Sequence, residues 1–189
     1  MAPEAASASA GNMMKTPDQD AVNEDSRSAE TFQYITFTIG DEEYGVDIMA
    51  VREIKGWSEP TVLPNTPAHM RGVLNLRGEI VPIFDLRCRF DQGRTEATNI
   101  HVIVIIAIAD RLAGMLVDAV SDIISIGRDD FKSVPKMDRQ IDTEYLSGLA
   151  TVKDRMVALL DAEKLFSMRD VENGILAGSN TPLLQQAEA

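Results

Sequence analysis

The sequence predicts a mainly β protein built as two similar small barrels with short helices. Three observations lead to this fold class. Short stretches rich in β-branched residues recur between turn signals, helical patterns are brief, and the chain matches itself when shifted by about 70 residues. Many short strands without βαβ alternation are typical of barrels or sandwiches. The internal match favours two copies of one barrel over a single sandwich.

The first predicted strands lie in the N-terminal half. Phe32–Ile39 alternates large and small side chains with a period of two, and Gly40-Asp41 is a turn signal that leads into Tyr44–Met49. Ile80–Leu86 is a further short, β-branched strand. Pro82 within it lacks a backbone donor, so we expect an edge strand or a bulge there.

The second half repeats this pattern. Asp110-Arg111 separates Ile100–Ala109 from Leu112–Val117, which predicts another hairpin, and Met156–Leu160 is the last predicted strand. Helical patterns are confined to short stretches near Pro67–Arg71, Thr143–Leu146 and Ala162–Met168.

The internal repeat has two offsets. A shift of 69 residues aligns 37–54 with 106–123 without a gap, with six identities in 18 positions, and a shift of 76 aligns 72–86 with 148–162. Gly72/Gly148 and Asp85/Asp161 are among the identities in the second block. A period near 70 residues is too long for a solenoid and suits a duplicated subdomain. We therefore expect two repeat units, 37–86 and 106–162, and leave open whether they exchange strands.

The two ends of the chain differ from its middle. Residues 1–31 are acidic and contain no aromatic side chain, so this leader cannot bury enough surface to offset its ordering entropy and is predicted to be disordered. Residues 168–189 carry Gly174, Gly178 and Pro182 among small and polar residues and are predicted to form a loose tail. The folded domain is expected at 32–167.

Composition and charge exclude several classes of function. With 30 acidic and 18 basic side chains among 189 residues, the net charge of −12 argues against a duplex nucleic-acid binder and against adhesion to anionic lipid. The longest apolar run, Ile100–Ala109, is about half the roughly 20 residues that a membrane-spanning helix needs. No secretory signal is visible, so we expect a cytoplasmic protein. The lone Cys88 excludes an internal disulfide and a Cys-rich zinc site.

The sequence offers no catalytic constellation. The two histidines, His69 and His101, lie far apart; we expect a hydrogen-bonded ring at His101 and an exposed one at His69. Cys88 has no thiolate-activating neighbour, and the acidic pairs Glu42-Glu43 and Asp129-Asp130 lie in predicted turns where solvated charge is ordinary. Phosphate-binding, dinucleotide-binding and zinc-protease motifs are absent. We predict no enzyme activity, no metal and no cofactor.

Two features suggest a binding surface instead. The turn Asn75-Leu76-Arg77-Gly78 can present the Arg77 guanidinium to carboxylates or carbonyls of a partner, or Arg77 can pair locally with Glu79 or Asp85. The second feature is apolar density that recurs in both units and could line a groove for a partner helix or form barrel core. Its candidate groove residues are Ile48, Met49, Val117 and Val120.

The run Asn75-Leu76-Arg77-Gly78-x-Ile80-Val81-Pro82-Ile83-x-Asp85-Leu86-Arg87 resembles the signature of the CheW family of bacterial chemotaxis coupling proteins. Further matching stretches follow in family order: Asp41–Ile48, Val51-x-Glu53-Ile54, Asn65–Pro67, Val117–Asp122 and Thr143–Leu149. The similarity covers about 32–166. The long acidic leader, and Trp57 with Pro60 and Pro64, depart from the usual pattern.

The resemblance implies a non-enzymatic scaffold of two five-stranded SH3-like barrels. Such a scaffold links the cytoplasmic tips of chemoreceptors to the regulatory domain of the histidine kinase CheA, contacts other copies in rings, and meets the membrane only through receptors. By position, the residues implied in receptor or kinase coupling are Val51, Glu53, Gly72, Asn75 and Arg77. Three alternatives remain: a CheW-like protein of a non-flagellar pathway such as twitching or surface sensing, an enzyme on the same fold, and an adaptor for proline-rich peptides.

Overall fold

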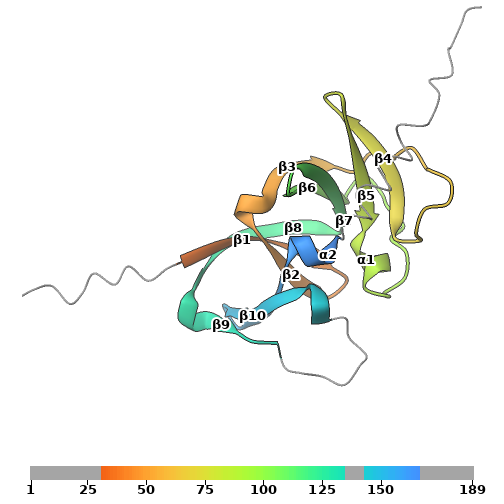
Figure 1. The fold of residues 1–189 in the computed structure, drawn as a ribbon. Coiled ribbons are helices and arrows are strands. Elements are labelled where there is room, and N and C mark those ends of the chain that lie inside the picture. The colour runs from red at the N-terminus through yellow and green to blue at the C-terminus, as the bar shows by residue number, and fades with distance from the viewer. Residues whose placement is uncertain (1–30, 135–142, 167–189) are drawn as a thin grey trace, which may run out of the picture.

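The computed structural model describes residues 31–134 and 143–166 (Figure 1). The predicted leader, apart from Thr31, and the predicted tail lie outside these ranges. The described chain is mainly β, as predicted, with two one-turn α-helices, α1 (Leu86–Arg89) and α2 (Ala162–Leu165), and short 3-10 turns. Its strands are β1 (Thr31–Ile39), β2 (Glu42–Asp47), β3 (Val51–Gly56), β4 (Met70–Leu76), β5 (Glu79–Asp85), β6 (Val102–Ile108), β7 (Arg111–Val117), β8 (Ala119–Gly127), β9 (Phe131–Lys132), β10 (Leu146–Val152) and β11 (Arg155–Leu160).

The strands form two sheets that correspond to the two barrels. One sheet has five strands in the order β3-β6-β7-β5-β4, all drawn from one continuous stretch of chain, and we call it the inserted barrel. The other has six strands in the order β8-β1-β2-β11-β10-β9, whose members precede and follow that stretch, and we call it the split barrel. The inserted barrel therefore interrupts the sequence of the split barrel, and the two lie side by side with α2 between them (Figure 1).

The elements follow the two sequence offsets. A shift of 69 residues carries β1, β2 and β3 onto β6, β7 and β8, and a shift of 76 carries β4, β5 and α1 onto β10, β11 and α2. Each barrel combines the hairpin of one repeat unit with the later strands of the other. The sheets thus exchange hairpins between the units.

A parallel strand pair joins the borrowed hairpin to its host in both barrels. Ile83 of β5 pairs with Gly114 of β7, and at the equivalent positions Leu159 of β11 pairs with Gly45 of β2. A Cβ at Gly114 would lie 2.5 Å from the Ile83 side chain, and one at Gly45 would lie 3.1 Å from that of Leu159. Both glycines therefore give the neighbouring strand's side chain the room it needs to fill the barrel.

The largest hydrophobic cluster lies between the barrels. It combines side chains of both barrels with the two helices, and the rings of Phe84 and Phe166 meet within it with centroids 4.8 Å apart. Smaller clusters fill the barrels themselves, one around Tyr34 and Leu159 and one around Ile83 and Ile105. Because burial of apolar area is the main favourable contribution to folding, the shared cluster couples the stability of the two barrels.

A buried ion pair fastens the long connection after α1 to the inserted barrel. Asp85 is fully buried; its carboxylate faces Arg71 at 3.2 Å and accepts hydrogen bonds from the backbone N–H and hydroxyl of Thr95 at 2.9 and 2.7 Å. Arg71 also donates to the Thr95 carbonyl and lies over the ring of Trp57. A buried carboxylate is tolerated when it is paired and hydrogen-bonded in this way.

Three local predictions need correction. Pro82 is neither on an edge strand nor itself at a bulge: β5 lies between β4 and β7, and its parallel pairing with β7 begins one residue later, at Ile83. No helix forms at Pro67–Arg71, where the Pro67 carbonyl accepts a hydrogen bond from the Met70 N–H at 2.9 Å to close a single turn, and β4 begins at Met70. His69 is half-buried rather than exposed, because its ring stacks on Phe84 and meets Arg89.

Candidate partner-binding surface

The tip of the β4–β5 hairpin is the most exposed of the predicted sites. Arg77 and Gly78 both have positive φ, at 54° and 93°, as the two central residues of a type I′ hairpin turn require. The Asn75 side chain accepts a hydrogen bond from the Gly78 N–H at 2.8 Å and closes the turn. Asn75 therefore shapes the tip, while the side chain of Arg77 is 85% exposed.

Arg77 is paired across the inserted barrel and not within its own hairpin. Its Nη2 lies 3.0 Å from Oε2 of Glu53 on β3, another of the five predicted coupling residues. The predicted alternative, a local pair with Glu79 or Asp85, is wrong for Asp85, which is buried with Arg71. An exposed ion pair of this kind adds little stability, so both groups remain available to a partner.

Gly72 is needed for the local backbone conformation and for the close approach of Thr61. Its φ of +136° belongs to a region that L-residues rarely adopt, and a Cβ would lie 2.2 Å from the carbonyl oxygen of Thr61. The Thr61 and Val73 backbones exchange two hydrogen bonds of 2.9 Å at this point. A role for Gly72 in coupling would therefore act through the shape of the neighbouring loop.

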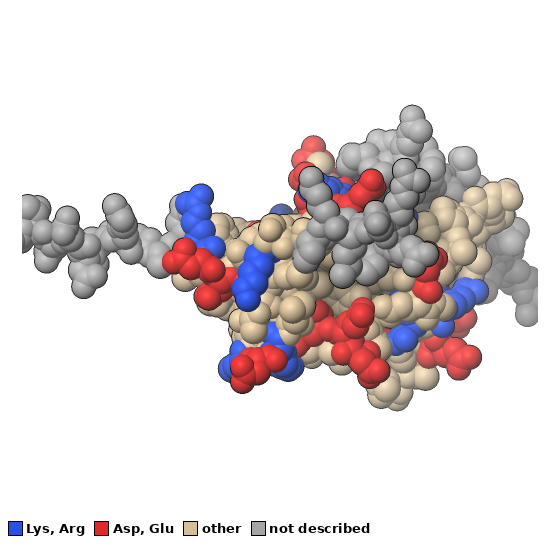
Figure 2. Space-filling model, turned by 90° about the horizontal axis from the view of Figure 1, so that it is seen from below, with Lys and Arg blue, Asp and Glu red and all other residues tan. Residues whose placement is uncertain are grey.

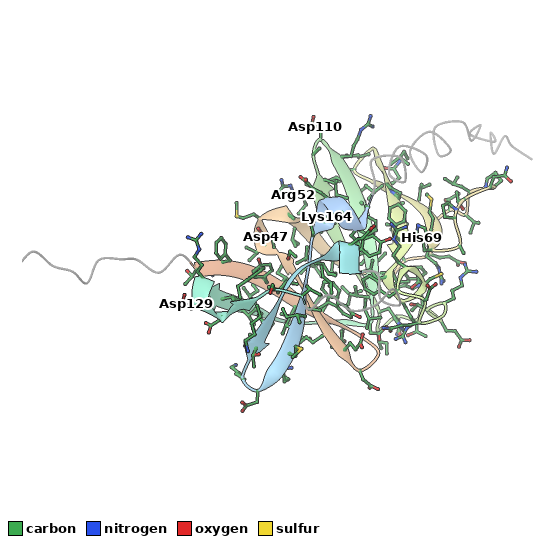
Figure 3. The ribbon with its side chains drawn as sticks, turned by 60° about the horizontal axis from the view of Figure 1, so that its bottom comes forward. Asp47, Arg52, His69, Asp110, Asp129 and Lys164 are labelled. Carbon is green, nitrogen blue, oxygen red and sulfur yellow. The ribbon has the colours of Figure 1, made fainter. Side chains whose placement is uncertain are left out.

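The crossover from the split barrel to the inserted barrel forms an exposed ledge. Ile48–Ala50 makes a 3-10 turn, capped by Asp47, whose carboxylate accepts from the Met49 N–H at 2.8 Å. Arg52 donates to the Met49 carbonyl at 3.0 Å, and Asp47 and Arg52 flank the turn (Figure 3). The Met49 side chain is 76% exposed, an unusual position for a large apolar group.

The predicted groove residues separate into surface and core. Val51 and Val120 are related by the 69-residue offset, and both are half-buried against the cluster between the barrels. Ile48 is half-buried and Met49 exposed. Val117, however, is 1% exposed and belongs to the core, so the expectation that it lines an open groove is not met.

An ion-pair cluster joins the barrels close to the second crossover, between β7 and β8. The Asp118 carboxylate accepts hydrogen bonds from Arg87 of the inserted barrel and from the Gly40 N–H of the split barrel, and His101 lies 3.8 Å away. This cluster was not predicted from the sequence. The sequence did contain a hint of it, because Arg87 ends the motif that begins at Asn75 and Asp118 lies within the motif Val117–Asp122.

The described residues contain no group of three or more side chains suited to a metal ion. Burial, with the carboxylate of Asp85 nearby, raises the pKa of the Cys88 thiol, which disfavours the reactive thiolate. The His101 ring is hydrogen-bonded to Thr98, as predicted. No helix in the described ranges is long and apolar enough to cross a membrane.

Comparisons with known proteins identify relatives over most of the chain. Residues 33–170 match the model of the CheW-like domain. The chain is 40% identical over 139 residues to the chemotaxis protein CheW of Klebsiella aerogenes, covering 74% of this chain and 84% of that one. It is 39% identical over 140 residues to a probable chemotaxis protein CheW of Rhizobium etli, covering 74% and 90%.

A solved structure agrees with the sequence relatives. The crystal structure of the scaffolding protein TtCheW from Thermoanaerobacter tengcongensis superposes with a TM-score of 0.69 at 32% identity. The match covers 76% of this chain and 97% of that one. The similarity therefore extends over nearly the whole of the solved scaffold.

Proposed function

Because the chain belongs to the CheW-like family, an adaptor family and not one of enzymes, we propose that it couples the cytoplasmic tips of chemoreceptors to the histidine kinase CheA. In this role it acts in the cytoplasm, is recruited to membrane receptor arrays, and contacts CheA and further copies of itself through its barrels. The relatives named above are chemotaxis proteins, so a non-flagellar pathway is not favoured.

One observation supports the proposal most directly. Two of the five residues that the family resemblance marks for coupling, Arg77 and Glu53, form an exposed ion pair, and Asn75 shapes the turn that presents it. The pair contributes little to folding, yet a planar guanidinium and a carboxylate in fixed positions can recognise complementary groups.

The apolar ledge suits a second partner. Met49 is exposed, and Val51 and Val120 are half-buried beside the crossovers. An amphipathic helix recognises such surfaces by apolar side chains on one face. We assign the ledge to the helical receptor tip and the Arg77–Glu53 hairpin region to the kinase, so that one rigid molecule holds both partners.

Kinase autophosphorylation tests the function. Receptor-containing membranes and CheA are assayed with and without this protein. We expect a marked rise in autophosphorylation that attractant suppresses. No change with folded protein and its cognate receptor and kinase would contradict the coupling role.

Arg77→Ala tests the surface, with Lys153→Ala as its matched control. Lys153 holds the equivalent turn position in the β10–β11 hairpin, with a φ of 49°. Both variants should change the free energy of unfolding by less than about 0.5 kcal/mol, as exposed substitutions usually do. Only Arg77→Ala should reduce kinase activation. Equal losses in both variants, or an unfolded Arg77→Ala by circular dichroism, would contradict the assignment.

The reversed pair Arg77→Glu with Glu53→Arg then separates the ion pair from the individual groups. If the pair only fixes the hairpin, the double reversal should restore activity that either single reversal removes. If the partner reads the charges directly, the double variant stays inactive.

A further inference from the structure

A groove of about 900 Å³ opens on the split barrel, away from the Arg77 hairpin and the ledge. It is bounded by the β1–β2 turn, by β10 and β11, and by the residues that follow α1. We call it the acidic groove. It shares no lining residue with the coupling residues discussed above.

The floor of the acidic groove is apolar and open. Phe90 and Tyr44 stack with ring centroids 5.1 Å apart, and Leu149 and Ala158 are half-buried beside them. The side chain of Met156 is 65% exposed. Apolar side chains gathered at a concave surface favour binding of a partner's apolar group, because contact removes their area from water.

The equivalent face of the inserted barrel is closed by its own chain. Val73, at the position of Leu149, is 6% exposed, and Met70, at the position of Leu146, is 5% exposed. Leu63 belongs to the same buried cluster at 4% exposure. Within the described ranges, the split barrel has no comparable cover over its groove. The same sheet face is thus core in one barrel and open in the other.

The rim of the groove is negatively charged. Its lining residues include four carboxylates against the single guanidinium of Arg155. Arg155 is already paired with Glu43 at 3.0 Å, and Glu42 accepts hydrogen bonds from Tyr44 and Gln92. In the view from below in Figure 2, acidic side chains lie together near the middle of the face, with basic side chains to either side.

Asp41 and Asp91 complete the rim. Both are exposed, and neither has an ion-pair partner among the described residues. Burial and the nearby Glu42 raise the pKa of the Tyr44 phenol, so the phenol stays protonated and donates its hydrogen bond to Glu42. Unpaired negative charge around an apolar floor is complementary to a cationic amphipathic segment.

We propose that a cationic amphipathic segment of a partner protein binds in the acidic groove. An apolar side chain of this segment packs on the floor, between Phe90 and Met156, and its Lys or Arg side chains pair with Asp41 and Asp91. The proposal does not depend on the coupling function. It requires that the groove be open in the full chain and that its own carboxylates, not the overall negative charge, select the ligand.

Cysteine accessibility tests the first requirement. Met156→Cys is made in a Cys88→Ser background of the full chain, with Asp110→Cys on the exposed β6–β7 turn as the fully accessible control. Maleimide should modify both cysteines at rates within about threefold of each other. Protection of Cys at 156 by tenfold or more would show that another part of this chain covers the groove, and would overturn the proposal.

A designed amphipathic helical peptide with Leu on one face and Lys on the other tests the second requirement, with its Leu–Glu counterpart as the negative control. Amide chemical-shift changes should centre on residues 41–44, 90–92 and 155–158. Asp41→Asn with Asp91→Asn should weaken binding by about fivefold, as two exposed charge pairs allow. Asp110→Asn with Glu59→Gln removes equal charge at exposed positions outside the groove lining and should leave the affinity unchanged. Equal weakening by both pairs, shifts elsewhere, or no binding would overturn the proposal.

Discussion

The inserted barrel and the split barrel share one strand plan but hold its equivalent positions with different contacts. Asp85 is the last residue of β5 and Asp161 follows the last residue of β11, and each caps the helix that comes next. Asp85 is fully buried with Arg71 and Thr95, whereas Asp161 is partly exposed and pairs with Lys164 at 3.1 Å. The same residue therefore fastens a long connection in one barrel and only begins a helix in the other.

The glycines show the same divergence. Gly72 and Gly148 occupy equivalent bulges, but an added Cβ would meet the Thr61 backbone at 2.2 Å in the first case and the Phe131 ring at 2.3 Å in the second. The Thr61 backbone is held in place by its hydrogen bonds to Val73, whereas the Phe131 ring can rotate or shift. Identical residues at equivalent positions of the two repeat units therefore mark a shared backbone geometry. How much each residue contributes to stability depends on the groups that pack around it in its own barrel.

The largest predicted difference concerns the two aspartates. Asp85→Asn should lower the free energy of unfolding by about 3 kcal/mol, because it leaves the largely buried Arg71 without its charge partner. Asp161→Asn should cost less than about 1 kcal/mol, because the cap is exposed and the amide oxygen still accepts. Urea unfolding followed by circular dichroism measures both. Similar losses would refute the distinction between the barrels.

The two bulge glycines come next. Gly72→Ala should destabilise the protein by about 3 kcal/mol, since it combines a Gly-only φ with a backbone clash. Gly148→Ala should cost about 1–2 kcal/mol, because the Phe131 ring can shift to make room. Thermal unfolding of the two variants in parallel gives the order. A larger loss for Gly148→Ala would show that the ring is fixed by its surroundings.

Substitutions at equivalent positions of the β1–β2 and β6–β7 turns should change the free energy of unfolding in opposite directions. Gly40 and Ala109 are equivalent and both have positive φ, at 61° and 50°. Ala109→Gly should raise the free energy of unfolding by up to about 1 kcal/mol by relieving left-handed strain, and Gly40→Ala should lower it by about the same amount. A decrease on Ala109→Gly would mean that unfolded-state entropy outweighs the strain.

The smallest expected effect is a pH dependence at Asp161. Burial acts to raise the pKa of this carboxyl, but hydrogen bonds from Lys164 and its positive charge outweigh burial, so the pKa lies below its ordinary value. A lowered folded-state pKa gives stability above the unfolded-state pKa of about 3.9, which is lost as pH falls through the folded value. The stability difference between the parent and Asp161→Asn should therefore shrink from pH 5 downwards. An unchanged difference to pH 2 would contradict this linkage.

Sequence periodicity predicted β1, β2, β5, β6, β7 and β11, and the match of the chain to itself predicted the repeat offsets. β3, β4, β8, β9 and β10 were not predicted as strands. Two features are visible in the sequence alone: the turn at Arg77-Gly78 and the spacing of Gly72 and Gly148. Membership of the two sheets is not, since a period of two shows which face of a strand is buried and says nothing about its neighbours.

The sequence predicted several residues of the candidate site, but it did not predict which of them contact one another. Arg77 and Glu53 were both singled out, but their pairing depends on β3 approaching the β4–β5 tip across the barrel. Val117 was indistinguishable from its neighbours because a buried apolar residue and a groove-lining one look alike in sequence. The acidic groove escaped notice because its lining residues come from distant segments of the chain.

The exchange of hairpins also fixes the order in which the protein can be completed during translation. β1 and β2 leave the ribosome first, yet their partners β8 and β11 are made after the whole inserted barrel. The inserted barrel has all its strands once Val117 has emerged, whereas the first hairpin must wait with Tyr34 and Phe37 unburied. Such a hairpin is exposed to mispairing until synthesis nears its end. Ribosome-bound chains in which β7 has emerged but β8 is still inside the ribosome should therefore carry one folded barrel and one open hairpin available to chaperones.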